Sequence, residues 1–232
     1  MNWKLETDSF TYSVSKDEKP LTRRGVLSTV NSLFDPLGFV APVVNQGRLL
    51  MRDLIQETLD WDKPLLEVNM QQWDNWRRSL TELEQLNIPR MCIPVLTPPG
   101  RQEIHVFSDA SEKAISSVAY LRDENAKGVV QVGFVLGKCK VAPQSGHTIP
   151  RLELCAAVMA VEIAETVSEQ IGVAIEKMKF YTDSRVVLGY LNNKVRRFYI
   201  YVQNRISRIL KSTAREQWHY VSTDDNPADQ GT

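Results

Sequence analysis

The order of local patterns after residue 100 constrains the fold of this chain more than any other feature. Three strand-like runs come first, then a long amphipathic helix, a fourth strand-like run, helical stretches and a fifth strand-like run. They cover residues 103–109, 115–122, 129–138, 150–171, 178–183, 184–212 and 217–222. Consecutive strands followed by alternating helices and strands predict an α/β domain with a mixed five-stranded sheet and flanking helices.

A sharp break precedes this domain and separates it from a mainly helical segment. Three prolines and one glycine fall within residues 94–100, a composition typical of a linker or tight turn. Helical patterns before the break cover residues 24–34, 45–59 and 69–86. In the last of these, apolar side chains recur at three- and four-residue steps and predict one buried face: Trp73, Trp76, Leu80, Leu83 and Leu86. We therefore expect a helical segment over 1–97 and an α/β domain over 98–232.

Composition excludes several classes of protein. Hydrophobic residues make up 43% of the chain, enough for a packed core, and the formal net charge is zero. The three cysteines, Cys92, Cys139 and Cys155, are widely spaced and form no C-x-x-C pair, which argues against a zinc site or a disulfide framework. No signal peptide and no apolar run of membrane-spanning length is present. We expect a soluble intracellular protein with free thiols, in the cytoplasm or the nucleus.

Four of the 28 acidic residues occupy positions that such a fold brings to one edge of its sheet. Asp109 and Asp183 each end a strand-like run, and ligands of open α/β sheets bind beyond the carboxyl ends of the strands. Glu153 lies in the first turn of the long helix, on a face otherwise lined by alanines. Asp229 lies in N-P-A-D, just after the last strand-like run.

Each of these acids also has a structural interpretation. Asp109 and Asp183 suit strand-end turns or helix N-caps, and Asp229 suits a capped helix start. Glu153 is favoured near a helix N-terminus by the helix dipole. Two observations favour a shared site. Asp109 and Asp183 end two matching strands, and the carboxylate of Glu153 lies on a face of small residues, where burial is costly unless the carboxylate is paired or bound to a metal.

Converging carboxylates are the ligands that Mg²⁺ or Mn²⁺ prefers. Two such ions about 4 Å apart activate water and stabilise the leaving oxygen of a phosphodiester. The pattern therefore predicts a two-metal nucleic-acid hydrolase.

A basic segment follows the fourth strand-like run. Residues 184–215 contain eight Lys or Arg and no Asp or Glu, with aromatic residues interleaved. On one helix, Arg197, Arg208, Lys211 and Arg215 would share a face able to follow a phosphate backbone. The alternative is an ordinary solvated helix face. The absence of acids favours nucleic-acid binding without base-specific readout.

Several short motifs resemble the ribonuclease H domain of retroviruses and retrotransposons. They are H-V-F-S-D-A-S (105–111), H-T-I-P-R-L-E-L (147–154), F-Y-T-D-S (180–184) and N-P-A-D (226–229). The run R-R-G-V-L-S-T-V-N-S-L-F-D-P-L-G-F-V-A-P-V (23–43), with the Trp-rich helix and I-P-R (88–90), is similar to the connection region of BEL/Pao retrotransposons. The resemblance spans almost the whole chain. It implies a polyprotein fragment that joins a reverse transcriptase connection region to a ribonuclease H domain.

The resemblance also implies an activity and a set of site residues. In that family, the matching acids, here Asp109, Glu153, Asp183 and Asp229, bind two magnesium ions and cut the RNA strand of an RNA–DNA hybrid. Expected nucleic-acid contacts are Ser111, Arg151, Ser184, Arg196 and Arg197. The partners would be the hybrid and other reverse transcriptase segments of the parent polyprotein, with no membrane. The chain stops soon after Asp229, so we expect the helix that follows the last acid in the family to be missing.

Two departures qualify the expected activity. The stretch before the last acid, V-S-T-D-D-N-P-A-D, lacks the histidine that retroviral enzymes often have there. Neither a Y-x-D-D polymerase motif nor a D-[ST]-G protease motif is present. Two rival functions stay open: a catalytically inactive nucleic-acid-binding remnant, and a structural module in which residues 1–97 dock onto polymerase parts.

Overall fold

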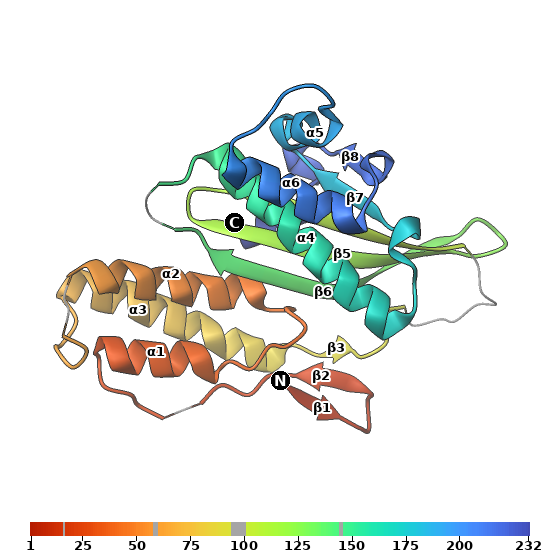
Figure 1. Cartoon of the computed structure of the whole chain (residues 1–232). Coiled ribbons are helices and arrows are strands. Elements are labelled where there is room, and N and C mark those ends of the chain that lie inside the picture. The colour runs from red at the N-terminus through yellow and green to blue at the C-terminus, as the bar shows by residue number, and fades with distance from the viewer. Residues whose placement is uncertain (16, 58–59, 94–100, 144–145) are drawn as a thin grey trace. The chain divides into compact units, whose positions relative to one another are not determined.

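A computed structural model describes the chain except for residues 16, 58–59, 94–100 and 144–145. It divides into two compact units (Figure 1). The first comprises residues 1–36 and 40–91, and the second comprises residues 37–39 and 92–232. The break expected at 94–100 lies outside the described residues.

In the part of the first unit that the structure describes there are three α-helices, as the sequence pattern predicts. They are α1 (Arg23–Ser32), α2 (Ala41–Glu57) and α3 (Glu67–Ser79), and the short 3-10 helix η1 (Leu80–Gln85) continues α3. Trp73 and Trp76 are buried with ring centroids 5.1 Å apart, and the Trp76 indole N–H donates to the carbonyl of Val43 on α2. Leu80 and Leu83 are buried as predicted, whereas Leu86, beyond the end of η1, is only half-buried.

A small antiparallel sheet in the first unit was not predicted. It consists of β1 (Asn2–Lys4), β2 (Ser9–Thr11) and β3 (Ile88–Pro89), in the order β1-β2-β3. Strands of two or three residues are too short to show an alternating pattern. The guanidinium of Arg90 makes two hydrogen bonds with the Asp8 carboxylate, which joins residues 82 positions apart in the sequence.

The second unit has the mixed five-stranded sheet that the sequence predicts. Its strands are β4 (Arg101–Ala110), β5 (Ala114–Glu124), β6 (Val130–Val141), β7 (Lys179–Thr182) and β8 (Trp218–Tyr220). Their spatial order is β6-β5-β4-β7-β8. The β6–β5 and β5–β4 pairs are antiparallel, whereas β4–β7 and β7–β8 are parallel. The α/β class is confirmed, with β4 and β7 adjacent at the centre of the sheet.

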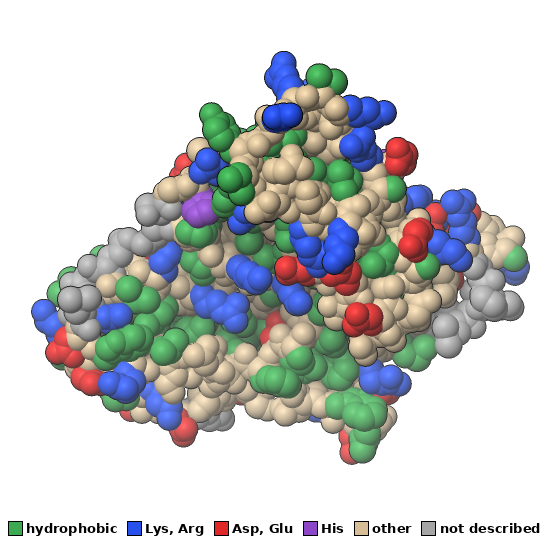
Figure 2. Space-filling model, in the orientation of Figure 1, with side chains coloured by type: hydrophobic (Ala, Val, Ile, Leu, Met, Phe, Trp, Pro, Cys, Tyr) green, Lys and Arg blue, Asp and Glu red, His purple; other side chains and the backbone are tan. Residues whose placement is uncertain are grey.

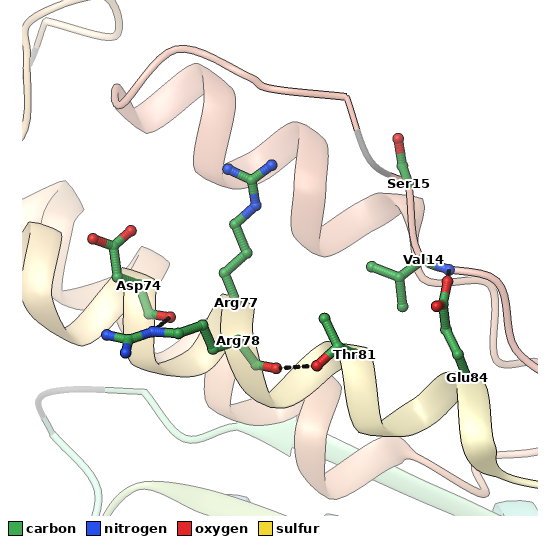
Figure 3. Close-up of a pocket in the computed structure, with 7 residues that line it drawn as sticks. All are labelled: Val14, Ser15, Asp74, Arg77, Arg78, Thr81 and Glu84. Carbon is green, nitrogen blue, oxygen red and sulfur yellow. Dashed lines mark hydrogen bonds between the residues drawn. The ribbon is translucent and has the colours of Figure 1, made fainter.

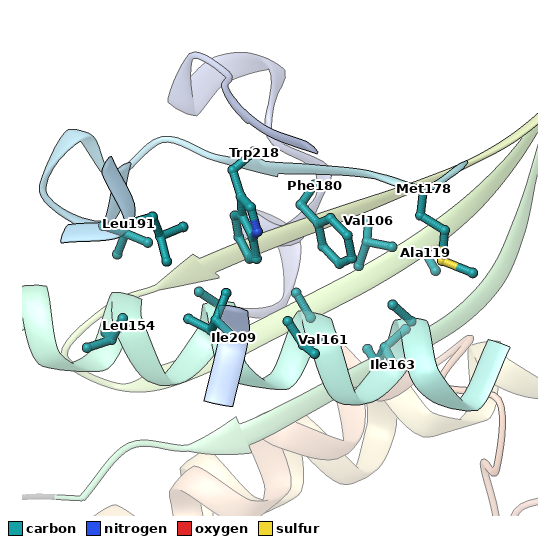
Figure 4. Close-up of a cluster of buried hydrophobic side chains, with 14 of the residues drawn as sticks. Val106, Ala119, Leu154, Val161, Ile163, Met178, Phe180, Leu191, Ile209 and Trp218 are labelled. Atoms are coloured by element: carbon teal, nitrogen blue, oxygen red, sulfur yellow. The ribbon is translucent and has the colours of Figure 1, made fainter. Parts of the chain in front are cut away.

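Helices cover one face of this sheet and form the core with it. The long helix α4 (Ile149–Ile171) packs against β4 and β5, and α6 (Ile200–Ser212) lies beside α4 (Figure 1). The shorter α5 (Arg185–Asn192) packs against β7 and β8. Phe180 and Trp218 stack with ring centroids 4.8 Å apart, and both face Val161 and Ile209 from the helices (Figure 4). This core holds the strand ends and the start of α4 in place.

A buried carboxylate links the two central strands at the opposite end of β4. Glu103 is 8% exposed and pairs with Lys179 on β7, with His105, and with Arg101 and Arg122. Burial opposes its ionisation, but the hydrogen bonds from His105 and Lys179 and the charges of Lys179 and Arg101 outweigh that effect. They lower the pKa of Glu103 to about 2. This network supports the β4–β7 pairing on which the strand-end acids depend.

Across the described stretches of the chain, none of the helices combines the length and the apolar character needed to span a membrane.

Candidate active site

The two strand-end acids lie at the same edge of the sheet. Ser108 on β4 is paired with Thr182 on β7 in parallel register, and the next residue along each strand is an aspartate, Asp109 and Asp183. Parallel neighbours end at the same edge, so the two carboxylates emerge side by side. Asp109 is still part of β4, opposite Ser116 of β5, whereas Asp183 follows the end of β7.

Asp109 is the most buried of the four acids, and its neighbours oppose its ionisation. It is 7% exposed. Burial raises the pKa of Asp109 most, and the negative charges of Asp183 and Asp229 raise it further, against a lowering hydrogen bond from Thr232. The Thr232 hydroxyl donates to the Asp109 carboxylate at 2.6 Å. The carboxylates of Asp183 and Asp229, which come from separate elements, therefore lie within electrostatic range of Asp109.

Glu153, the fifth residue of α4, reaches this edge from the N-terminal part of that helix. The Ser184 hydroxyl donates to its carboxylate at 2.6 Å and also caps α5 by accepting from the backbone N–H of Val187 at 3.1 Å. Ser184 is buried and directly follows Asp183 in the chain. One hydroxyl thus connects the helix acid to the end of β7.

Asp229 is held at the sheet edge by the turn that contains it. It lies on the short 3-10 helix η5 (Pro227–Gly231), which packs against β4 and β5. The buried Asn226 caps η5 with its side-chain oxygen, which accepts from Ala228 N at 3.2 Å. Its amide donates at 3.1 Å to the carbonyl of Ser108, the residue before Asp109. Asn226 is therefore a positioning residue that joins the Asp229 turn to the Asp109 strand.

Replacing Asn226 tests this positioning role. We expect Asn226→Ala to weaken Mn²⁺ binding about 10-fold, because the lost hydrogen bonds free η5 and leave the buried Ser108 carbonyl unsatisfied. Titration of Mn²⁺ followed by the rise in Tm measures the affinity, and urea unfolding checks the fold. Gln230→Ala, an exposed change in the same turn, is the matched control. Unchanged Mn²⁺ affinity in a folded Asn226→Ala protein would show that Asn226 does not position Asp229.

The four acids do not form a closed ligand set. Among the described residues, which include all four, no group of three or more His, Cys, Asp or Glu side chains is arranged so that it could hold a metal ion. Asp229 is exposed, and Asp183 accepts a hydrogen bond from the Thr223 hydroxyl at 2.8 Å. The structure brings three acids close enough to interact and joins the fourth to them through Ser184.

Three hydroxyl partners of the acids were not predicted from the sequence. Ser184 was proposed as a nucleic-acid contact, but its hydroxyl bonds to Glu153. Thr223 and Thr232 bond to Asp183 and Asp109 across 40 and 123 residues of chain. Hydroxyl residues flank each acid motif, but contacts over such separations have no local sequence signal.

The other predicted nucleic-acid contacts fall into two groups. The Ser111 hydroxyl accepts from the backbone N–H groups of Lys113 and Ala114 in the β4–β5 turn, and Arg151 lies over the Tyr201 ring at 5.2 Å. Both are therefore engaged within the protein. Arg196 and Arg197 are exposed between α5 and α6. In Figure 2, Lys and Arg side chains gather over α5 and the segment that follows it.

The basic helix face expected from the sequence is corrected in two respects. Arg208 forms a two-pronged ion pair with Glu165 on α4, so it faces the protein and not a phosphate backbone. Arg197 precedes α6 and does not share its face. A cavity of about 380 Å³ does lie beside α6, and its charged lining residues are all basic: Lys194, Arg196, Lys211 and Arg215.

The first unit contains a separate pocket of about 510 Å³ beside α3 and η1. Its charged lining is mixed, with Asp74 and Glu84 beside Arg77 and Arg78 (Figure 3). Glu84 accepts a hydrogen bond from the backbone N–H of Val14, and Arg77 extends away from α3 (Figure 3). None of the predicted site residues lines this pocket.

A match to a family model shows the family to which the chain belongs. The model described as Pao retrotransposon-like RNaseH-like domain matches residues 22–184, more than half of the chain. The chain belongs to this family. The matched range of the Pao retrotransposon-like RNaseH-like domain includes Asp109, Glu153 and Asp183, whereas Asp229 falls beyond it. No curated protein matches the chain.

Solved structures with little sequence identity are similar to this Pao-family chain. The foamy viral protease-reverse transcriptase in complex with dsDNA is 12% identical with a TM-score of 0.51, and the match covers 90% of this chain and 40% of the viral chain. Ribonuclease H1 of Halobacterium salinarum is 13% identical with a TM-score of 0.36, covering 54% of this chain and 90% of that enzyme. LC11-RNase H1 in complex with an RNA/DNA hybrid is 10% identical with a TM-score of 0.37, and the match covers 56% of this chain and 92% of that enzyme.

Proposed function

We propose that this chain hydrolyses the RNA strand of RNA–DNA hybrids endonucleolytically, in a reaction that depends on two divalent metal ions, during reverse transcription of a retroelement. The observation that carries the proposal is the meeting of Asp109, Asp183 and Asp229, from separate elements, at one sheet edge. Glu153 is joined to the same edge through Ser184. The negative charges of Asp183 and Asp229, which raise the pKa of the buried Asp109, favour a bound cation.

The chemistry of these donors suits Mg²⁺ or Mn²⁺. All four proposed ligands are carboxylates, and hard divalent ions prefer oxygen donors. Asp109 is the strongest indication, because burial and the charges of Asp183 and Asp229 all raise its pKa and a cation would reverse both charge effects. Asp109, Glu153, Asp183 and Asp229 would hold the ions. When bound, the ions supply an activated water and neutralise charge on the leaving oxygen.

The remaining contributions come from the chain itself. Asn226 fixes the turn that carries Asp229, and Ser184 orients the Glu153 carboxylate. Arg196 and Arg197, exposed beside the basic cavity, would bind phosphates of the hybrid and hold it in register without reading bases. Positioning of this kind contributes to the rate by replacing a bimolecular encounter with a bound, oriented complex.

Cleavage of a labelled RNA–DNA hybrid by the purified chain tests the proposal. We expect cutting of the RNA strand with Mg²⁺ or Mn²⁺, no cutting with chelator, and no cutting of a DNA duplex of the same sequence. The labelled products would be internal fragments, as an endonuclease produces. A folded chain that binds the hybrid but leaves the RNA intact with either metal would refute the enzymatic proposal.

A separate prediction about hybrid binding concerns Arg196 and Arg197, in the segment between α5 and α6. In the described part of the chain, neither Arg196 nor Arg197 forms an ion pair with a carboxylate. We expect Arg196→Gln with Arg197→Gln to weaken binding of all hybrid sequences and to reduce the slope of log Kd against log salt by about 1–2. Fluorescence anisotropy at several salt concentrations measures both. The Arg196→Lys, Arg197→Lys protein keeps both charges and should retain the slope.

A second candidate function is a nucleic-acid-binding remnant without turnover. The observation that favours it is the absence, among the described residues, of a group of acids arranged to hold a metal. Salt-dependent hybrid binding without metal-dependent cutting would support this function. The basic cavity would then be the functional site, and substitution of the acids would leave all activities unchanged.

We further propose that residues 1–97 act as a connection segment and residues 98–232 as the ribonuclease H-like domain. Other reverse transcriptase segments of a parent polyprotein would be partners of the first unit. The foamy viral chain, which is a protease-reverse transcriptase, supports this by matching 90% of the present chain within a longer one. Co-purification of the first unit with a polymerase segment, at a stable ratio, tests it.

A further inference from the structure

One wall of the basic cavity, the cavity of about 380 Å³ beside α6, comes from α6 and the residues just after it. Gln203, Ser207 and Lys211 follow one another along α6 at four-residue steps, and Arg215 continues this spacing just beyond the end of the helix. Residues four apart on a helix share a face. All four line the cavity. This wall therefore presents two neutral polar side chains and two cations.

The other wall comes from the end of α5 and the segment that follows it. Its lining residues are Tyr190, Asn193, Lys194, Arg196 and Phe198. The Asn193 side-chain oxygen accepts from the backbone N–H groups of Val195 at 3.2 Å and Arg196 at 3.0 Å, and its amide donates to the Arg196 carbonyl at 2.8 Å. The rings of Tyr190 and Phe198 pack edge to face with centroids 5.1 Å apart. These contacts hold Lys194 and Arg196 on an ordered segment.

The charged residues of the lining are all cations, two from each wall: Lys194, Arg196, Lys211 and Arg215. Within the described part of the chain, none of them forms an ion pair with a carboxylate. The lowered pKa of Glu165 on α4 is due first to the hydrogen bond from Arg208, and Lys211 contributes to it only through its charge. Four like charges facing one cavity repel one another, so a bound anion would stabilise this arrangement.

The shape of the basic cavity favours a small anion with several charges. Small molecules bind in pockets of about 300–1,000 Å³. The phosphates of a nucleic-acid duplex are separated by sugars on a convex surface, so a concave cavity admits few of them. In a di- or triphosphate, neighbouring phosphates share a bridging oxygen and concentrate their charge. Arginine forms two parallel hydrogen bonds with such oxygens and lysine binds them as a point charge.

We propose that the basic cavity binds a di- or triphosphate group, either as a free polyphosphate or as part of a nucleotide. Lys194 and Arg196 would bind its oxygens from one wall, and Lys211 and Arg215 from the other. The inference goes beyond cleavage of the hybrid and does not depend on it, because none of the four candidate-site carboxylates lines the cavity. Arg196 is shared with the proposed hybrid contact, so the test variants leave it unchanged.

Isothermal titration calorimetry of the whole chain tests the proposal directly. Tripolyphosphate, orthophosphate and ATP are titrated at constant ionic strength with chelator present, so that no divalent ion links them to the carboxylates. We expect tripolyphosphate to bind at least about tenfold more tightly than orthophosphate, because it contacts cations of both walls at once. ATP binding as tightly as tripolyphosphate would identify the phosphates alone as the ligand, and tighter ATP binding would identify a nucleotide. Tripolyphosphate binding that is absent, or no tighter than that of orthophosphate, would overturn the proposal.

Variants separate a built site from general attraction to positive charge. Lys211→Gln with Arg215→Gln should weaken tripolyphosphate binding about tenfold or more. Lys194→Gln, an exposed change on the other wall, should weaken it about threefold or more and provides the test if the double variant does not fold.

Lys140→Gln with Lys177→Gln is the matched control. It removes the same two charges from exposed positions that do not line the cavity. We expect this control to bind tripolyphosphate as the wild-type chain does, and urea unfolding checks the fold of each protein. Equal weakening in the control and in the Lys211, Arg215 double variant, or unchanged affinity in both test proteins, would refute the site.

Discussion

Substituting Asn for Asp183 or Asp109 is expected to reduce cleavage of the hybrid by about 100- to 1,000-fold while hybrid binding is retained. Each change removes a charged oxygen from the proposed metal ligands and keeps the side-chain shape. Asp183 adjoins Ser184, which holds Glu153, and its charge is one of those that raise the pKa of Asp109. Loss of either carboxylate therefore weakens the whole ligand set. Single-turnover cleavage, with anisotropy for binding, measures both effects.

The chain offers a matched control for these substitutions. Asp224 is an exposed acid of the 3-10 helix η4 (Thr223–Asp225), next to the residue that bonds to Asp183. Asp224→Asn should cleave at the wild-type rate, because it changes net charge equally without touching the proposed ligands. Equal loss in Asp224→Asn and Asp183→Asn would mean that charge alone matters. Joint loss of folding and binding in Asp183→Asn would remove the catalytic assignment.

The second large expected effect is that replacing Asp109 with Asn stabilises the folded chain at neutral pH. An acid whose pKa is raised by folding stabilises the folded state while it is protonated. That contribution is complete below the usual Asp pKa of 3.8 and is lost as pH rises through the higher pKa of the folded chain. At pH 7 the wild-type chain therefore carries a buried, repelled charge that Asp109→Asn lacks. We expect the variant to melt about 2–4 °C higher, the shift that about 1 kcal/mol produces in a protein of this size.

Adding a divalent metal ion should make the wild-type chain melt at a higher temperature than Asp109→Asn. A divalent ion that binds only the folded wild-type chain stabilises it by about 2.7 kcal/mol at a hundred times its Kd. Asp109→Asn lacks a ligand and should gain much less. Thermal melts with chelator and with Mn²⁺, at pH 7 and near pH 3, test both predictions. A wild-type chain that melts above Asp109→Asn with chelator at pH 7 contradicts the burial argument, and equal Mn²⁺ shifts in both proteins contradict the metal site.

The two predictions fail separately, which makes them informative together. If Asp109→Asn is more stable but Mn²⁺ shifts neither protein, the carboxylates repel one another without binding metal, as the remnant function requires. If Mn²⁺ stabilises the wild-type chain but no hybrid is cut, the ligand set is intact and the defect lies in substrate positioning.

Local sequence patterns were sufficient to predict those features that depend on residues close to one another in the sequence. The alternating runs around β4 and β7 predicted both strands and placed an acid at each strand end, because side chains in a strand alternate between faces. The three- and four-residue spacing of Trp73 and Trp76 predicted the buried face of α3, which the structure confirms. The Pao-like motifs predicted the family. Strands as short as β1 and β3 carry too few residues for any pattern.

By itself, then, the sequence determined the order and type of the main elements, the α/β class and the acids at the sheet edge. Only the tertiary structure decided which groups meet those acids. Asn226 reaches Ser108 across 118 residues of chain, Thr232 reaches Asp109 across 123, and Arg208 turns from the expected phosphate face to Glu165 on α4. The physical reason is that periodicity depends on adjacent residues, whereas hydrogen bonds and ion pairs between distant residues depend on how the elements pack.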